Sequence, residues 1–186
     1  LVLAAVCVCR DMTEGYRGTH TPKALYDAYR SLSVELPDKQ QVYFVDVREY
    51  RNYGLPESEY SCVEGVEEGY NRLHRAVARH GRKAGAHRYD LTLGNGDRLL
   101  VHSTDLLRVY IGKGSPDEIQ LALRLAVEYK LVRPTLGALQ SYCDKYIGLD
   151  CSGFTGVYYG HPYRGKRSTD YRTAGREWKE LSELVP

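Results

Sequence analysis

The sequence has few cysteines and little net charge, and both limits narrow the choice of function. Its 186 residues include five cysteines, an odd number with no Cys-x-x-Cys pair, so neither a zinc ribbon nor a disulfide framework is indicated. We therefore expect no metal site and no cofactor. Lys and Arg total 26 against 24 acidic residues, and the formal charge of +2 offers no overall electrostatic case for a nucleic-acid partner.

Long apolar runs are also lacking. The longest, "LVLAAVCVC" at residues 1–9, is too short to span a bilayer and has neither the basic region nor the cleavage site of a signal peptide. We expect no membrane span, and interpret this run as a buried strand or helix, or as the remnant of a targeting segment. Because the chain starts at Leu1 and not at Met, we expect both ends to be cut.

Local patterns predict a mixture of helices and hairpin strands. Ser115, Pro116 and Glu118 combine an N-cap, a proline at the first helical position and a capping box, which predicts a helix over 115–131. Two alternating runs around the turn 94–97 predict a β-hairpin. The other expected elements are helices over 21–34, 64–80 and 139–143, strands over 41–47 and 105–112, and a loop over 50–62.

These elements predict the α+β class. We expect an unassigned α+β region over residues 1–133, with a basic helix and a hairpin, and the start of a hydrolase domain over residues 134–186.

Four arginines are spaced to share one face of the helix expected over 64–80. They are Arg72, Arg75, Arg79 and Arg82, and no acidic residue occurs between Tyr70 and Arg88. This stripe is either a solvated face or a docking surface for a polyanion. The polyanion could be nucleic acid, an anionic envelope polymer or an acidic partner.

The stretch "LDCSGFTGVYYG" combines an N-cap residue with a cysteine. Asp150 can cap a short helix that ends near Gly160, which would place Cys151 in the first turn. Free backbone N–H groups there favour a thiolate and can stabilise an oxyanion. Gly153 would leave room for a substrate backbone. The alternative is that Cys151 is a small buried hydrophobe.

This stretch resembles the nucleophile motif of NlpC-like papain-fold cysteine peptidases, which is Asp-Cys-Ser-Gly followed by two apolar residues. The resemblance covers roughly residues 142–186. It implies a helix packed on an antiparallel sheet, with Cys151 as nucleophile and Asp150, Ser152 and Gly153 as its frame. A tyrosine often shapes the oxyanion site in that family, and either Tyr142 or Tyr146 could serve. The family's usual substrates are bacterial cell-wall peptides, which favours a secreted or cell-envelope location over the cytoplasm.

The base histidine is the part of the motif that this chain does not clearly provide. His161 is ten residues along the same helix, about 15 Å from the cysteine. His102, at the end of a predicted strand, could substitute, as in circularly permuted relatives. Otherwise the base lies beyond Pro186 or on a second chain, or there is none. The tail 168–186 resembles the segment that leads to the base-bearing strand, so we expect an incomplete sheet with an exposed edge beside the cysteine helix.

Two functions follow from these observations. The first is a cysteine hydrolase that cleaves a peptide or amide bond through an acyl-enzyme. The second is a catalytically inactive papain-fold binding or scaffold module that uses the basic helix face.

Overall fold

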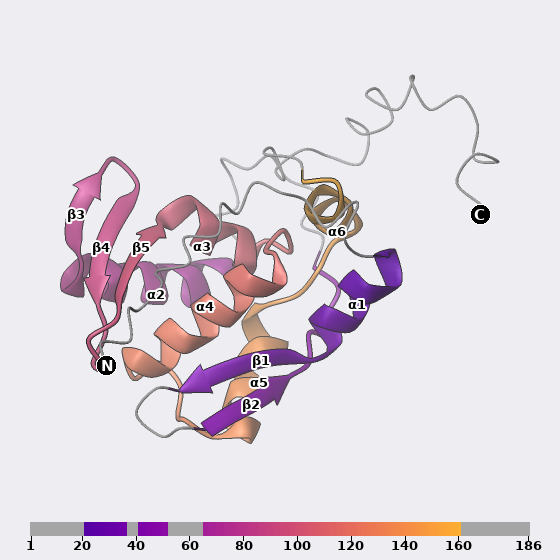
Figure 1. Cartoon of the computed structure of the whole chain (residues 1–186), viewed down its shortest axis with the longest axis horizontal. Helices are drawn as coiled ribbons and strands as arrows, with labels where there is room; N and C mark the ends of the chain where they lie inside the picture. Colours follow the sequence, from indigo (N-terminus) through magenta and orange to yellow (C-terminus); the bar gives the residue numbers. More distant parts are fainter. Residues whose placement is uncertain (1–20, 37–40, 52–64, 161–186) are drawn as a thin grey trace, which may run out of the picture.

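The computed structural model describes residues 21–36, 41–51 and 65–160, which form six helices and two small antiparallel sheets (Figure 1). The α+β class is confirmed. Residues 52–62 of the loop expected over 50–62, the run 1–9, His161 and the tail 168–186 lie outside the described residues. In chain order the elements are α1 (Pro22–Arg30), β1 (Leu32–Leu36), β2 (Gln41–Val45), α2 (Val66–His80), β3 (Arg82–Gly85), β4 (Arg88–Thr92), β5 (Arg98–His102), α3 (Ser103–Tyr110), α4 (Pro116–Glu128), α5 (Leu136–Tyr146) and α6 (Cys151–Tyr158).

The two sheets are joined through a layer of helices. Strands β1 and β2 form one sheet, and β3, β4 and β5 form the other in that order. Helix α4 packs on β1 and also contacts α2 and α3, while α2 packs on β4. One hydrophobic cluster includes residues from both sides of the boundary expected at 133, such as Leu123 and Leu139. The division into two domains stays a prediction.

Two predicted elements are confirmed in detail. At the start of α4 the Ser115 hydroxyl accepts from the Glu118 N–H at 3.2 Å, and the Glu118 carboxylate accepts from the Ser115 N–H at 2.7 Å. The hairpin forms with Leu91 opposite Leu99. Both elements depend on contacts between residues close in sequence, so local sequence patterns predict them.

Two other predictions were wrong. The helix expected over 21–34 ends at Arg30, and Leu32, Val34 and Leu36 are buried at alternate positions of β1, which pairs with β2. The strand expected over 105–112 is helix α3. Its buried residues Leu106, Val109 and Tyr110 are three and four positions apart, which is the helical period, and a short apolar run is compatible with either structure.

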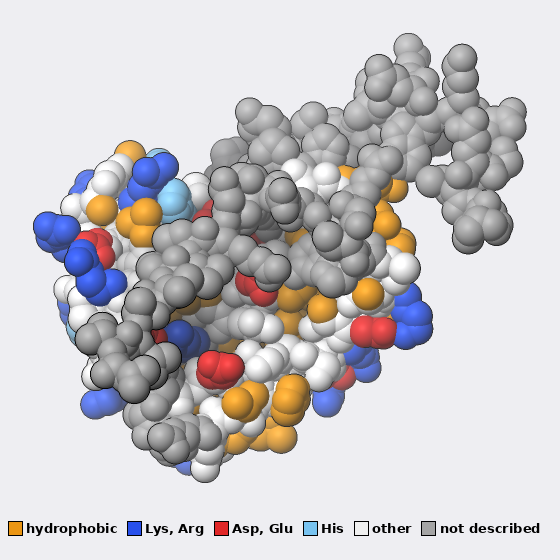
Figure 2. All heavy atoms as spheres, in the orientation of Figure 1, with side chains coloured by type: hydrophobic (Ala, Val, Ile, Leu, Met, Phe, Trp, Pro, Cys, Tyr) orange, Lys and Arg blue, Asp and Glu red, His pale blue; other side chains and the backbone are white. Residues whose placement is uncertain are grey.

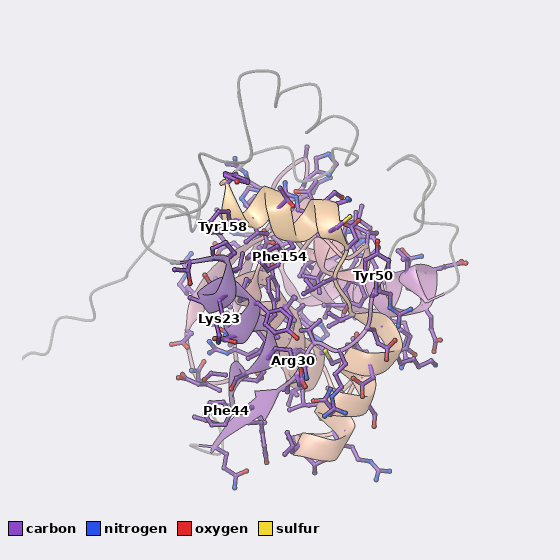
Figure 3. The ribbon with its side chains drawn as sticks, turned by 90° about the vertical axis from the view of Figure 1, so that its right-hand side faces the viewer. Lys23, Arg30, Phe44, Tyr50, Phe154 and Tyr158 are labelled. Carbon is purple, nitrogen blue, oxygen red and sulfur yellow. The ribbon has the colours of Figure 1, made fainter. Side chains whose placement is uncertain are left out.

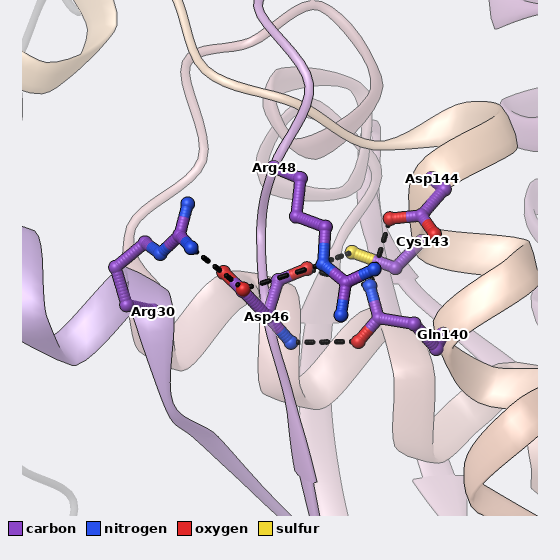
Figure 4. A network of polar contacts seen from close by, with 6 residues as sticks. All are labelled: Arg30, Asp46, Arg48, Gln140, Cys143 and Asp144. Carbon is purple, nitrogen blue, oxygen red and sulfur yellow. Dashed lines mark hydrogen bonds and ion pairs between the residues drawn. The ribbon is translucent and has the colours of Figure 1, made fainter.

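A polar network joins α5 to the end of β2 (Figure 4). Gln140 donates from its amide to the Asp46 carbonyl at 2.8 Å and accepts from the Asp46 N–H at 2.9 Å. The Asp46 carboxylate binds Arg30 at 3.0 Å and Arg48 at 3.3 Å. The segment after β2 is therefore held along α5. Among the described residues, no helix has the length and apolar character needed to cross a membrane.

Candidate functional site

Cys151 lies exposed in the first turn of α6. The Asp150 carboxylate caps this helix by accepting from the Gly153 N–H, as the sequence predicted. The thiol is thus on the surface, next to backbone N–H groups that have no partner within the helix.

The segment that follows β2 reaches this helix N-terminus. The Arg51 guanidinium donates to the Asp144 carbonyl in the last turn of α5 at 2.9 Å. The Arg51 N–H donates to the Leu149 carbonyl at 2.8 Å, and the Leu149 N–H donates to the Glu49 carbonyl at 2.9 Å. This short parallel pairing sets residues 49–51 against the loop that enters α6.

That pairing places Tyr50 beside Cys151. Its hydroxyl lies 4.0 Å from the Cys151 sulfur, although the two residues are 101 positions apart. Figure 3 shows Tyr50 at the end of α6 where the chain arrives from α5. Tyr50 is 64% exposed and Cys151 is exposed as well, so both residues face solvent. Sequence reasoning missed Tyr50 because nothing local to it indicates the contact with residues 149–151.

Tyr142 and Tyr146 lie in the core instead. The Tyr142 and Tyr110 hydroxyls are hydrogen bonded at 2.8 Å, and burial raises the pKa of Tyr142 to about 12. The Tyr146 ring packs edge-on against Tyr142 at 4.9 Å. The described contacts of these two tyrosines do not include the sulfur, so the tyrosine that the structure brings to Cys151 is Tyr50.

A buried cluster of three polar side chains includes both sequence neighbours of Cys151. Lys113 donates to the Asp150 carboxylate at 2.9 Å and also to the Ser152 hydroxyl. Ser152 in turn donates to the other Asp150 oxygen at 2.7 Å. Asp150 and Ser152 were predicted as the frame of the nucleophile, whereas Lys113 was not predicted.

Gly153 has a different role from the one expected. A Cβ at this position would lie 2.8 Å from the Lys113 Cα and would also meet the Gly112 carbonyl. The close approach is therefore made by the chain's own turn after α3 and not by a substrate. The Asp150 N–H donates to the Gly112 carbonyl at 2.9 Å, which joins the same turn to the loop before α6.

His102 lies away from this turn. It is the last residue of β5 and precedes α3, whereas Gly112 follows α3. Helix α3 has 8 residues, and at 1.5 Å per residue it spans about 12 Å. No described contact joins His102 to the sulfur, and its role as base stays a prediction.

The sheet on which the cysteine helix was expected to pack is not confirmed either. The contacts described for α6 run to Tyr50, to the turn at 112–113 and to α1, where the Phe154 and Tyr29 rings are 6.1 Å apart.

The arginine stripe is only partly helical. Helix α2 ends at His80, so Arg82 lies in β3, where it binds Asp90 at 3.0 Å. Gly81 is the C-cap, where a Cβ would lie 2.9 Å from the Val77 carbonyl oxygen, so this close turn into β3 favours glycine. Arg72 and Arg75 bond within α2, to Glu68 and to the Asn71 carbonyl. Figure 2 shows Lys and Arg side chains gathered over the β3–β5 sheet, and polyanion docking stays a prediction.

Cys143 contrasts with Cys151. It is buried in α5, where its thiol weakly donates to the Asp46 carbonyl, and burial raises its pKa to about 12. Across residues 21–36, 41–51 and 65–160, no group of three or more His, Cys, Asp or Glu side chains is arranged to hold a metal ion.

Comparison with models of protein families, with curated proteins and with solved structures found no match for this chain. The function is therefore argued from the geometry around Cys151 and from the sequence motif.

Proposed function

We propose that this protein is a cysteine hydrolase of the papain-like class that cleaves a peptide or amide bond. The observation that carries the proposal is the position of Cys151, which is exposed in the first turn of α6 with its helix capped by Asp150. The other described cysteine, Cys143, is buried and its thiol is held in the neutral form.

In the reaction, the N-terminus of α6 stabilises first the thiolate and then the oxyanion. The Cys151 thiolate attacks the carbonyl carbon, a C–S bond forms, and free N–H groups of α6 stabilise the oxyanion. The C–N bond then breaks as the amine takes a proton. Water hydrolyses the thioester to release the acid and restore the thiol. The Tyr50 hydroxyl, 4.0 Å from the sulfur, can donate a hydrogen bond to the oxyanion or to the leaving amine.

The sequence motif supports the substrate class. "LDCSGFTGVYYG" resembles the NlpC-like nucleophile motif, and bacterial peptidoglycan peptides are that family's usual substrates. On this proposal the protein acts in the cell envelope or outside the cell. The base is a histidine outside the described residues or on a second chain, or His102 after a rearrangement.

One observation favours a second candidate, an inactive papain-fold binding module. In the part of the chain that the structure describes, the polar group reported at the Cys151 sulfur is the Tyr50 hydroxyl and not a histidine. A binding module would retain the fold and use the basic surface of α2 and the β3–β5 sheet.

The test uses an activated ester and peptidoglycan fragments with the full chain. We expect p-nitrophenyl acetate to give a burst of p-nitrophenolate and an acetyl group on the Cys151 peptide, detected by mass spectrometry. The same protein should release new amino termini from peptidoglycan peptides. Cys151→Ala should lose both activities, while Cys143→Ala should keep them. Undiminished turnover in Cys151→Ala would refute the proposal, and a protein that releases no amines would favour the binding module.

A further inference from the structure

Lys113 is a buried lysine whose ammonium group binds the residues on both sides of Cys151. It is 3% exposed, and its two described partners, Asp150 and Ser152, are 7% and 6% exposed. The backbone directs it there: Gly112, with φ +80°, ends α3, and the Lys113 N–H donates back to the Arg108 carbonyl at 2.8 Å.

Capping alone does not explain this arrangement. An N-cap needs a side-chain oxygen, and Asn or Ser supplies one without a charge. Asp150 instead places a carboxylate in the interior, where a charge is stable only when it is paired and hydrogen bonded. Lys113 provides that pairing at 2.9 Å. The chain thus holds two buried charges next to an exposed cysteine where a neutral cap would suffice.

A serine–lysine catalytic pair is excluded by the same contacts. The Ser152 hydroxyl donates to Asp150 and accepts from the Lys113 ammonium, so its proton and a lone pair are both engaged. Its burial also keeps a substrate from it. The cluster therefore supports the neighbouring thiol and does not react itself.

We infer that Lys113 is a positioning residue for Cys151, which neutralises the Asp150 carboxylate and holds the first turn of α6 against the turn after α3. Without Lys113, the Asp150 charge would oppose the thiolate at the adjacent residue. With it, the field at the sulfur comes from the helix N-terminus and is positive. The inference rests on the proposed function for its biological meaning, but its test needs no substrate.

The test measures how fast the neutral probe iodoacetamide alkylates Cys151 at neutral pH, with the site resolved by peptide mass spectrometry. Lys113→Met should slow this rate by at least about tenfold, because a unit charge within about 12 Å contributes about 1.4 kcal/mol or more at an effective dielectric constant of about 20. Asp150→Asn should react at least as fast as the wild type. Lys113→Met/Asp150→Asn should recover most of the rate. Lys145→Met, at an exposed lysine paired with Glu68, is the matched control and should leave the rate unchanged.

The outcomes separate the inference from the proposed function. If the native chain alkylates Cys151 no faster than the urea-unfolded chain, the thiol is not activated and the proposed function fails. If the native chain is fast but Lys113→Met is equally fast, the inference alone fails. A double variant as slow as Lys113→Met would overturn charge neutralisation. Should Lys113→Met not fold, an Asp150→Asn rate below the wild-type rate would overturn the inference.

Discussion

The buried hydroxyl pair of Tyr110 and Tyr142 allows a quantitative test of the core beneath the site. Tyr110 is fully buried and Tyr142 is 8% exposed, and their hydroxyls are 2.8 Å apart. Burial raises the pKa of both groups, to about 12 for Tyr142, so both are neutral donors and acceptors at neutral pH. Replacing one by Phe removes a hydrogen bond and leaves the partner hydroxyl unpaired in the interior.

The expected loss of stability depends on whether one or both hydroxyls are removed. Tyr142→Phe should lower the free energy of unfolding by about 1 to 3 kcal/mol, the desolvation cost of a buried unpaired hydroxyl. Tyr110→Phe should cost a similar amount, because it leaves the buried Tyr142 hydroxyl unpaired in the same way. The double variant leaves no unpaired hydroxyl and should lie within about 1 kcal/mol of the wild type. The two changes are therefore expected to be non-additive by at least about 1 kcal/mol.

Urea denaturation of the wild type, both single variants and the double variant gives this coupling energy directly. Cys151 alkylation by iodoacetamide should be unchanged in Tyr142→Phe, because the described contacts of Tyr142 do not include the sulfur. Additive single changes would refute the pairing. A large loss of Cys151 reactivity in a folded Tyr142→Phe protein would show that Tyr142 does influence the thiol.

Two further predictions concern packing and pH. In urea denaturation, Gly153→Ala should lower the free energy of unfolding by about 1 to 3 kcal/mol, because its Cβ would meet backbone atoms. Gly137→Ala is the control: the new Cβ has open space around it, so this variant should not be destabilised. Equal losses in the two variants would contradict this reasoning. Burial, with a smaller effect of His87, lowers the pKa of His74 below its usual value. The unfolded chain therefore binds a proton before the folded one as the pH falls, so the wild type should lose stability relative to His74→Gln between about pH 7 and about pH 5, and a pH-independent difference would refute the shift.

The sequence was most informative where backbone groups form their hydrogen bonds with residues nearby in the chain. The Ser115 and Glu118 capping box, the 94–97 turn and the Asp150 cap each involve groups within a few residues, so their patterns predict the structure. That locality is also why the sequence predicts Cys151 in the first turn of a helix, where it lies. Short apolar runs lack this property, and the segment 105–112 was assigned the wrong structure for that reason.

Tertiary structure alone decided which groups surround the thiol. Tyr50 reaches Cys151 across 101 positions, and Lys113 reaches Asp150 across 37, because residues 49–51 and the turn after α3 both meet the loop before α6. Neither contact has a local signal: a lysine after a glycine and a tyrosine in a polar segment are equally compatible with exposure to solvent. Tertiary packing likewise buried Tyr142 and Tyr146. Their rings fill space between helices, and the sequence does not predict how those helices lie relative to one another. Residue identity determined that a cysteine begins α6, and long-range packing determined its neighbours.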